Sequence, residues 1–181
     1  MNDIKLSADV KEYLDKPTTA AFLSAARQFV TLLETADIKK EEFYRKSHGA
    51  LAELYLTGHN LEQVDLKYSG PDSDFDNDKF FDNKDAGHIS QLEKDAFYWE
   101  VFDPNYEKEE EPTQGWLVDD FTDIYRHLKI ELTKIEAIGT DEATEDAFWQ
   151  LRFGFYHHWG NHCINALRAL HYLWYDGKVA M

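Results

Sequence analysis

The pattern of apolar side chains predicts a long helix over residues 145–175. Apolar residues recur there at steps of three and four, which is the period of a helix face. A second apolar stripe runs beside the first, so the helix is apolar on most of its circumference, and such a helix belongs in the middle of a bundle. Gly154 and Gly160 mark positions of a kink or a close helix contact. The first stripe consists of Phe148, Phe155, Trp159, Cys163, Ala166, Leu170 and Leu173.

Helical periodicity extends to most of the remaining chain. It predicts helices at about 8–15, 19–36, 40–57, 88–98 and 115–138. Ser7 and Thr140 are suitable N-caps, and Gly58 and Gly139 are suitable C-terminal stops. Because only a short turn at Gly139 separates 115–138 from 145–175, these two helices are expected to form an antiparallel hairpin. We therefore expect an all-α bundle of five or six helices with a long central C-terminal helix.

The chain becomes strongly acidic between residues 65 and 112. This segment contains 15 Asp or Glu against 5 Lys, within a chain of 181 residues and net charge −16. We interpret it as a loop-rich acidic insertion in a single helical domain spanning 1–181. The charge argues against binding to nucleic acid or an anionic membrane, and it fits a basic protein partner.

The N-terminal segment and the cysteine content indicate the cellular compartment in which the protein is expected. The N-terminal segment lacks an apolar signal region, and no run of 18 apolar residues is present. Cys163 is the single cysteine and cannot form an internal disulfide, which fits a reducing compartment. We therefore expect a cytoplasmic protein.

Two residue pairs at helical spacing are candidates for metal chemistry. His158 and His162 are four residues apart, as are Asp123 and His127 on the preceding helix. Facing each other, the two pairs would form a His/carboxylate site inside a bundle. The zinc-protease pattern HExxH is absent, however, and a hydrogen-bonded polar layer between helices explains the same residues. From the sequence we assign no metal and identify no cofactor.

Two arginines lie in otherwise apolar helices. A lone buried charge is costly, so Arg126 and Arg152 are expected to pair with carboxylates, for which Asp119, Asp123 and Glu100 are the candidates. The alternative is a pocket for an anion.

Several long motifs resemble a bacterial family catalogued only as a domain of unknown function. The motifs are YWEVFDP at 98–104, DDFTDIYRHLK at 119–129, FWQLRFGFYHHWGNH at 148–162 and ALRALH at 166–171. The resemblance is good over roughly 98–173, loose over the first 65 residues, and brings no activity. His127 departs from the family pattern, where an acidic residue is expected. The resemblance implies that family-wide motifs include Glu100, Asp120, Asp123, Tyr125, Arg126, Arg152, His158, Trp159, His162 and Arg168.

Two functional classes follow, and the direction in which the polar residues point distinguishes them. Polar side chains that pair with one another in a closed core favour an interaction or adaptor module. The absence of a complete set of catalytic residues favours the same class. Convergence on an open cavity favours a small-molecule or metal-binding protein, whether or not it is an enzyme. The candidate pocket lies between the 115–138 and 145–175 helices and comprises Glu100, Asp120, Asp123, Arg126, Trp149, Arg152, His158, His162 and Arg168.

Overall fold

The computed structural model describes residues 6–35, 37–70, 73, 75, 77–80, 89, 92, 96–101 and 103–175. Within this part of the chain, the helices are α1 (Ala8–Leu14), α2 (Pro17–Glu34), α3 (Lys40–Asn60), α4 (Leu117–Thr133), α5 (Asp141–His157) and α6 (Trp159–Tyr175). A 3₁₀ turn, η1 (Asn77–Phe80), a π-helical turn, η4 (Lys134–Ile138), and two short strands, β1 (Phe97–Glu100) and β2 (Thr113–Trp116), complete the elements.

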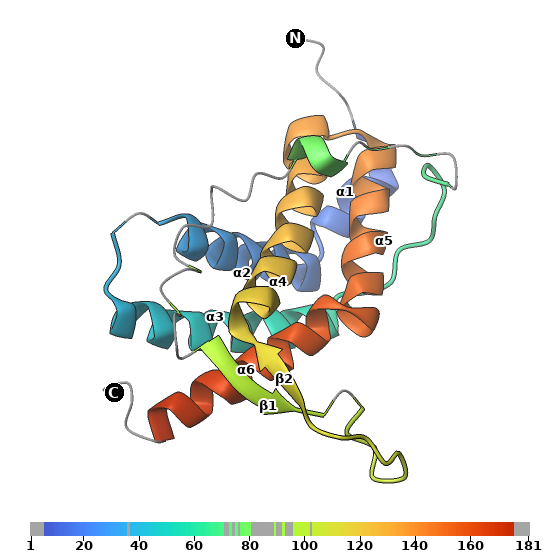
Figure 1. Ribbon diagram of the computed structural model, residues 1–181. Coiled ribbons are helices and arrows are strands. Elements are labelled where there is room, and N and C mark those ends of the chain that lie inside the picture. The colour runs from blue at the N-terminus through green and yellow to red at the C-terminus, as the bar shows by residue number, and fades with distance from the viewer. Residues whose placement is uncertain are drawn as a thin grey trace.

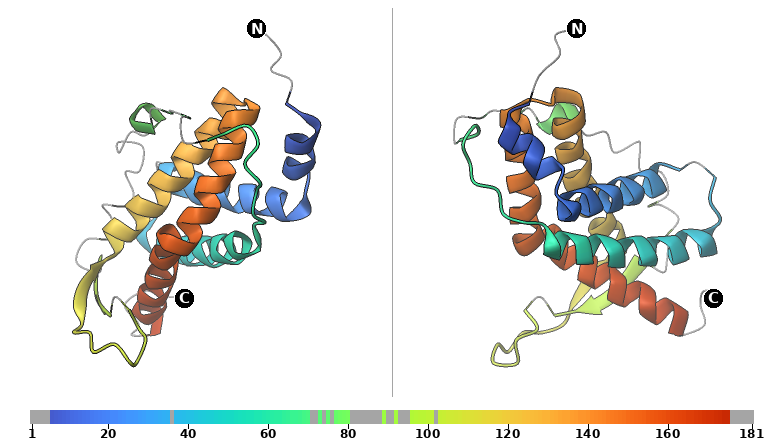
Figure 2. Two further views of the ribbon diagram at one scale, coloured as in Figure 1. Left: turned by 90° about the vertical axis from the view of Figure 1, so that its right-hand side faces the viewer. Right: turned by 180° about the vertical axis from the view of Figure 1, so that it is seen from behind.

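The helices form two groups that cross each other. α4 and α5 run side by side in opposite directions, while α2 and α3 form a second antiparallel pair behind them (Figure 1). α6 leaves the end of α5 at an angle and packs beneath α3 (Figure 2). The predicted all-α class is confirmed. None of the described helices is long and apolar enough to cross a membrane.

The first three helices follow the sequence prediction closely. The hydroxyl of Ser7 accepts a hydrogen bond from the amide of Val10, so Ser7 caps α1 as expected. Pro17 occupies the first turn of α2, where its missing N–H costs nothing. α3 continues two residues beyond Gly58 before its last turn closes through a bond from Leu61 N to the Gly58 carbonyl.

A β-hairpin replaces part of the predicted helical structure. β1 and β2 pair antiparallel, with Phe97 opposite Trp116 and Tyr98 opposite Gly115. The predicted 88–98 helix is therefore wrong at 97 and 98, and most of its other residues lie outside the described part. For the same reason, the predicted 115–138 helix begins at Leu117. The pairing joins residues 13 to 19 positions apart, so a local pattern does not reveal it.

The predicted single helix over 145–175 is two helices. His158 has φ −149° and ψ −88°, which ends α5, and α6 starts at the next residue. The indole N–H of Trp159 folds back and donates to the carbonyl of Leu151 at 3.0 Å. A Cβ on Gly160 would stand only 2.1 Å from the carbonyl oxygen of Phe155, and one on Gly154 would stand 2.7 Å from the Trp159 ring. The glycines thus allow a sharp bend that a continuous helix lacks.

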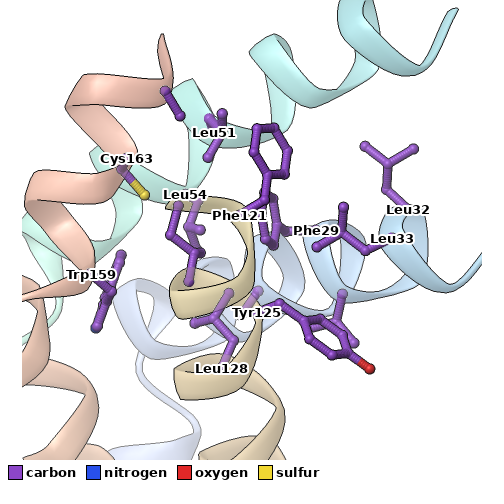
Figure 3. Close-up of a cluster of buried hydrophobic side chains, with 14 of the residues drawn as sticks. Phe29, Leu32, Leu33, Leu51, Leu54, Phe121, Tyr125, Leu128, Trp159 and Cys163 are labelled. Atoms are coloured by element: carbon purple, nitrogen blue, oxygen red, sulfur yellow. The ribbon is translucent and has the colours of Figure 1, made fainter. Parts of the chain in front are cut away.

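The main core lies where α2, α3, α4 and α6 meet. Phe29 and Phe121 stack with their ring centroids 5.8 Å apart, and Trp159 is completely buried. The thiol of Cys163 points into the same core, and burial raises its pKa, so it is a buried apolar group rather than a nucleophile. Figure 3 shows this cluster, with Phe29, Leu32, Leu33, Leu51, Leu54, Phe121, Tyr125, Leu128, Trp159 and Cys163 labelled.

A buried ionic group joins the end of α4 to α5. Lys134 is 1% exposed, and its Nζ lies 2.8 Å from Oδ2 of Asp146. It also lies 2.9 Å from Oε2 of Glu131, in the geometry of an ion contact rather than a directed hydrogen bond. Burial raises the pKa of Glu131 to about 7, although the charge of Lys134 acts in the opposite direction.

We expect Gly160→Ala to destabilise the protein by about 1–3 kcal/mol, because its methyl group would collide with the fixed carbonyl of Phe155. Urea denaturation followed by circular dichroism measures the change. Gly49→Ala in α3 is the matched control, since nothing lies within 4 Å of its Cβ position. That substitution should be neutral or stabilising by up to about 1 kcal/mol. Equal stability of the Gly160 variant and the wild type would contradict this account of the bend.

We expect stability to fall as Glu131 ionises. Its folded pKa lies above its ordinary value of 4.5, so the folded state holds the proton more tightly, and stability is lost as the pH rises through about 7. Between pH of about 6 and 8, the wild type should lose on the order of 1 kcal/mol more than Glu131→Gln. Glu136→Gln removes a half-exposed carboxylate nearby and should leave the wild-type slope unchanged. Parallel pH profiles for wild type and Glu131→Gln would refute the expectation.

Candidate functional site

Three elements bring polar side chains together at the front of the bundle. α4 presents Asp120 and Asp123 on one face, three residues apart. The α5–α6 junction places His158 against α4, and the first turn of α6 adds His162. β1 crosses in front of α6 (Figure 1), and its Tyr98 hydrogen-bonds to Asp120 of α4.

Asp123, His158 and His162 direct one ligand atom each toward a common point. Oδ2 of Asp123 lies 3.4 Å from Nε2 of His162 and 3.7 Å from Nε2 of His158. All three candidate ligand atoms fall within 4.8 Å of one another. The side chains of His158 and Asp123 are 44% and 33% exposed, so solvent reaches this cluster, which we call the His/Asp cluster.

Asp120 supports the His/Asp cluster from behind. It is 3% exposed, and its Oδ1 lies 2.7 Å from Nδ1 of His162, while the hydroxyl of Tyr98 donates to Oδ2 at 2.7 Å. An ionised carboxylate can only accept, so it fixes the His162 tautomer in which Nδ1 carries hydrogen and Nε2 faces Asp123. Burial lowers the pKa of His162, but the hydrogen bond and charge of Asp120 outweigh it, so the net shift is upward.

His127 lies beside the His/Asp cluster as a second imidazole. Its Nδ1 lies 3.1 Å from the backbone carbonyl of Asp123, which can only accept, so Nδ1 donates. Burial, together with the neighbouring His158, lowers the pKa of His127 and keeps its ring neutral. Its ring centroid is 4.8 Å from that of His158. The structure thus brings the two predicted pairs together, but His127 contacts the ring of His158 and is not one of the three residues whose candidate ligand atoms converge.

Glu100 extends the polar network along β1. The side-chain amide of Asn165 donates to Oε2 of Glu100 at 2.5 Å. Burial and the nearby charge of Asp120 raise the pKa of Glu100, while burial also raises that of Tyr98. Two carboxylates thus share one half-buried region, and each is stabilised by donors from another element.

One atom of this region lacks a protein partner. Nδ1 of His158 is buried and makes no hydrogen bond to any described residue. Buried polar atoms without partners are uncommon in native proteins, and each requires an explanation, such as a water, an ion or a functional role. Four other buried side-chain atoms of the described residues share this property, namely Thr19 Oγ1, Ser47 Oγ, Glu131 Oε2 and Thr144 Oγ1, but His158 Nδ1 is the one that belongs to the His/Asp cluster.

The remaining predicted residues lie elsewhere. Arg168 is exposed beside the loop that follows β1, and Arg126 is exposed on α4. Trp149 and Arg152 border a separate hollow on another face of α5. The expected ion pair of Arg152 is wrong, since no described carboxylate pairs with it and its guanidinium lies over the ring of Tyr156 instead.

Sequence reasoning missed two members of the network. Tyr98 and Asn165 are not in the predicted pocket, although both hydrogen-bond to predicted residues. Burial alternates along Phe97–Glu100 in the structure, with Tyr98 and Glu100 on the less exposed face, but the run of three aromatic residues in this segment shows no alternation of apolar and polar residues. Asn165 follows His162 by three residues and so shares its helix face.

A comparison with known protein families assigns the chain to one of them. The family model described as "Domain of unknown function (DUF5063)" matches residues 14–176. The chain belongs to this family. The match extends well beyond the motifs at 98–173 and includes α2 and α3, and it indicates no specific function for DUF5063 members. No curated protein matches the chain.

A solved structure shares the fold of this DUF5063 protein. The crystal structure of protein BF1032 from Bacteroides fragilis aligns with a TM-score of 0.68 and 20% sequence identity. The alignment covers 88% of this chain and 93% of that chain. At this level of identity, the similarity supports the arrangement of helices and not a shared activity.

Proposed function

We propose that this DUF5063 protein binds a divalent transition-metal ion through Asp123, His158 and His162. The observation that carries the proposal is the convergence of one carboxylate oxygen and two imidazole nitrogens at the His/Asp cluster. Two histidines and one carboxylate are a donor set of both catalytic zinc sites and non-haem iron sites. Such sites keep a coordination position open for water or a small ligand.

The spacing of the donor atoms supports the proposal. Zn–N and Zn–O bonds of about 2.0–2.1 Å in a tetrahedron place ligand atoms about 3.3 Å apart. The 3.4 Å and 3.7 Å separations around Asp123 are close to this value. The imidazole nitrogens of His158 and His162 lie within 4.8 Å of each other, so tetrahedral binding requires side-chain rotations that bring the two imidazoles closer together.

The surroundings resemble a metal site more than a closed polar layer. The hydrogen bond from His162 Nδ1 to Asp120 is the kind of contact that orients ligating histidines and increases their basicity. A closed layer would bury and pair every polar group, yet His158 is exposed on one side and unpartnered on the other. These features favour the ligand-binding class over the adaptor class.

We expect freshly purified protein to bind roughly one Zn²⁺ per chain. Replacing Asp123 or His162 with alanine should weaken binding by roughly 100-fold or more, since one of three ligands is lost. Isothermal titration calorimetry gives the affinity, and native mass spectrometry with elemental analysis gives the stoichiometry. The matched control is His157→Ala, an exposed histidine adjacent to His158 that lies outside the His/Asp cluster.

Two results would overturn the proposal. One is the absence of any zinc, iron or manganese binding by a folded protein. The other is binding that His157→Ala reduces as much as His162→Ala does, because that would indicate nonspecific imidazole coordination.

An interaction surface for a basic protein partner is a second candidate function. The outward face of β1 exposes Phe97 and Trp99, and Trp99 is 72% exposed. Exposed glutamates at 107 and 109–111 follow in the loop between the strands. Tryptophan is enriched at interface hot spots, and the adjacent negative charge would attract lysine or arginine.

A synthetic peptide that alternates lysine and leucine tests this surface. Its affinity should fall about tenfold or more in Trp99→Ala. It should also fall as salt increases. Tyr172→Ala is the control, because Tyr172 is a comparably exposed aromatic residue on α6. Equal losses in the two variants, or no binding at low salt, would exclude a basic partner at this hairpin.

The other expectations from the sequence remain predictions. They are the cytoplasmic location, the single domain spanning 1–181 and the lack of nucleic-acid binding. The single Cys163 continues to support the cytoplasmic location, and the net charge of −16 continues to support the lack of nucleic-acid binding.

A further inference from the structure

The face of α5 that borders the segment after α3 carries an exposed ladder of aromatic rings. Trp149 and Phe153 stack with centroids 4.9 Å apart and an interplanar angle of 7°. Phe153 also contacts His157, with centroids 4.5 Å apart. Phe153 is 48% exposed, so this stack is not part of the core. Phe153 has a ring neighbour on each side, so the face of this ladder that is available to stack with a further ring is the outer face of Trp149.

A neighbouring row on α5 adds a positive charge. The guanidinium carbon of Arg152 lies 4.2 Å from the ring centroid of Tyr156, which holds the side chain against the helix. Its Nη1 approaches the carbonyl of Gly58 at 3.5 Å, the limit of a hydrogen bond. No described carboxylate forms an ion pair with Arg152, so most of its donors remain available to an anion.

The two rows border one hollow. It has a volume of about 380 Å³, is open to solvent and is bordered on its other side by Gln63 and Val64. Of the described residues that line it, Arg152 is the one with a permanent charge. A cavity of this size suits a small molecule of one or two rings. In a chain of net charge −16, a hollow with a positive, aromatic lining is chemically distinct.

We propose that this hollow binds a small aromatic anion, with its ring stacked on the outer face of Trp149 and against the edge of Phe153, and with its carboxylate or phosphate held by Arg152. The ring ladder selects a planar body. The guanidinium fork selects a planar, negatively charged group, because it can donate two parallel hydrogen bonds to one anion. The site is separate from the His/Asp cluster and does not depend on metal binding.

Naphthoate, the matching uncharged naphthylmethanol and the cationic naphthylmethylamine test the proposal. Each is titrated into the full chain while amide and indole signals are followed by NMR. Naphthoate should bind best, the alcohol about tenfold more weakly and the amine weakest, because only the carboxylate pairs with Arg152. The signals that shift should belong to Trp149, Phe153 and the segment at Gln63.

Variants separate the roles of charge and ring. Arg152→Gln should reduce the affinity for naphthoate to that for the alcohol, and Phe153→Ala should weaken both probes. Arg168→Gln is the control, since it removes an exposed arginine from α6 outside this hollow. Retention of the native circular dichroism spectrum confirms that each variant is folded.

Three outcomes would overturn the proposal. They are no binding of naphthoate, equal binding of the three probes, and equal losses in Arg152→Gln and Arg168→Gln. Because none of them involves a metal, failure here leaves the result of the zinc titration unaffected.

Discussion

The bend between α5 and α6 is the constraint on which the rest of this structure depends. It requires the indole of Trp159 to fold back onto the carbonyl of Leu151, and it requires Gly160 to pass beside the carbonyl of Phe155 without a side chain. The bend sends α6 beneath α3 and allows α4 to contact both α5 and α6. It also leaves His158 outside regular helix geometry, so that this imidazole turns toward Asp123. Packing of the core and assembly of the His/Asp cluster therefore follow from the same few residues.

The β-hairpin links the polar network to the surface. Along β1, Tyr98 points inward and hydrogen-bonds Asp120, while Glu100 meets Asn165. The alternate residues, Phe97 and Trp99, face solvent. One short strand thus supplies, on one side, the hydroxyl that hydrogen-bonds the carboxylate behind His162 and, on the other side, an aromatic surface. The close packing of Tyr98 against Gly115 of β2 secures this orientation, since a Cβ there would lie 2.4 Å from the tyrosine ring.

The candidate site could be predicted in part. The four-residue spacing of His158 and His162 indicated a shared helix face, and it remained informative although a helix starts between them. Arg152 was misassigned because periodicity indicates that a residue lies in an amphipathic helix but not which neighbour its side chain meets. Tyr98 was missed because its partner lies 22 residues away, across a strand–helix contact that no local pattern encodes.

Local physical chemistry in the sequence by itself determined the helical class, most helix limits and the caps at Ser7 and Thr140, because these depend on residues within one or two turns. It also determined membership of DUF5063, since the motifs are contiguous. Only the tertiary structure decided where the 145–175 segment bends, that 97–100 pairs with 113–116, and that Arg152 lies apart from the histidines. Each of these depends on contacts between segments distant in the chain, whose free energy appears only when the two surfaces meet.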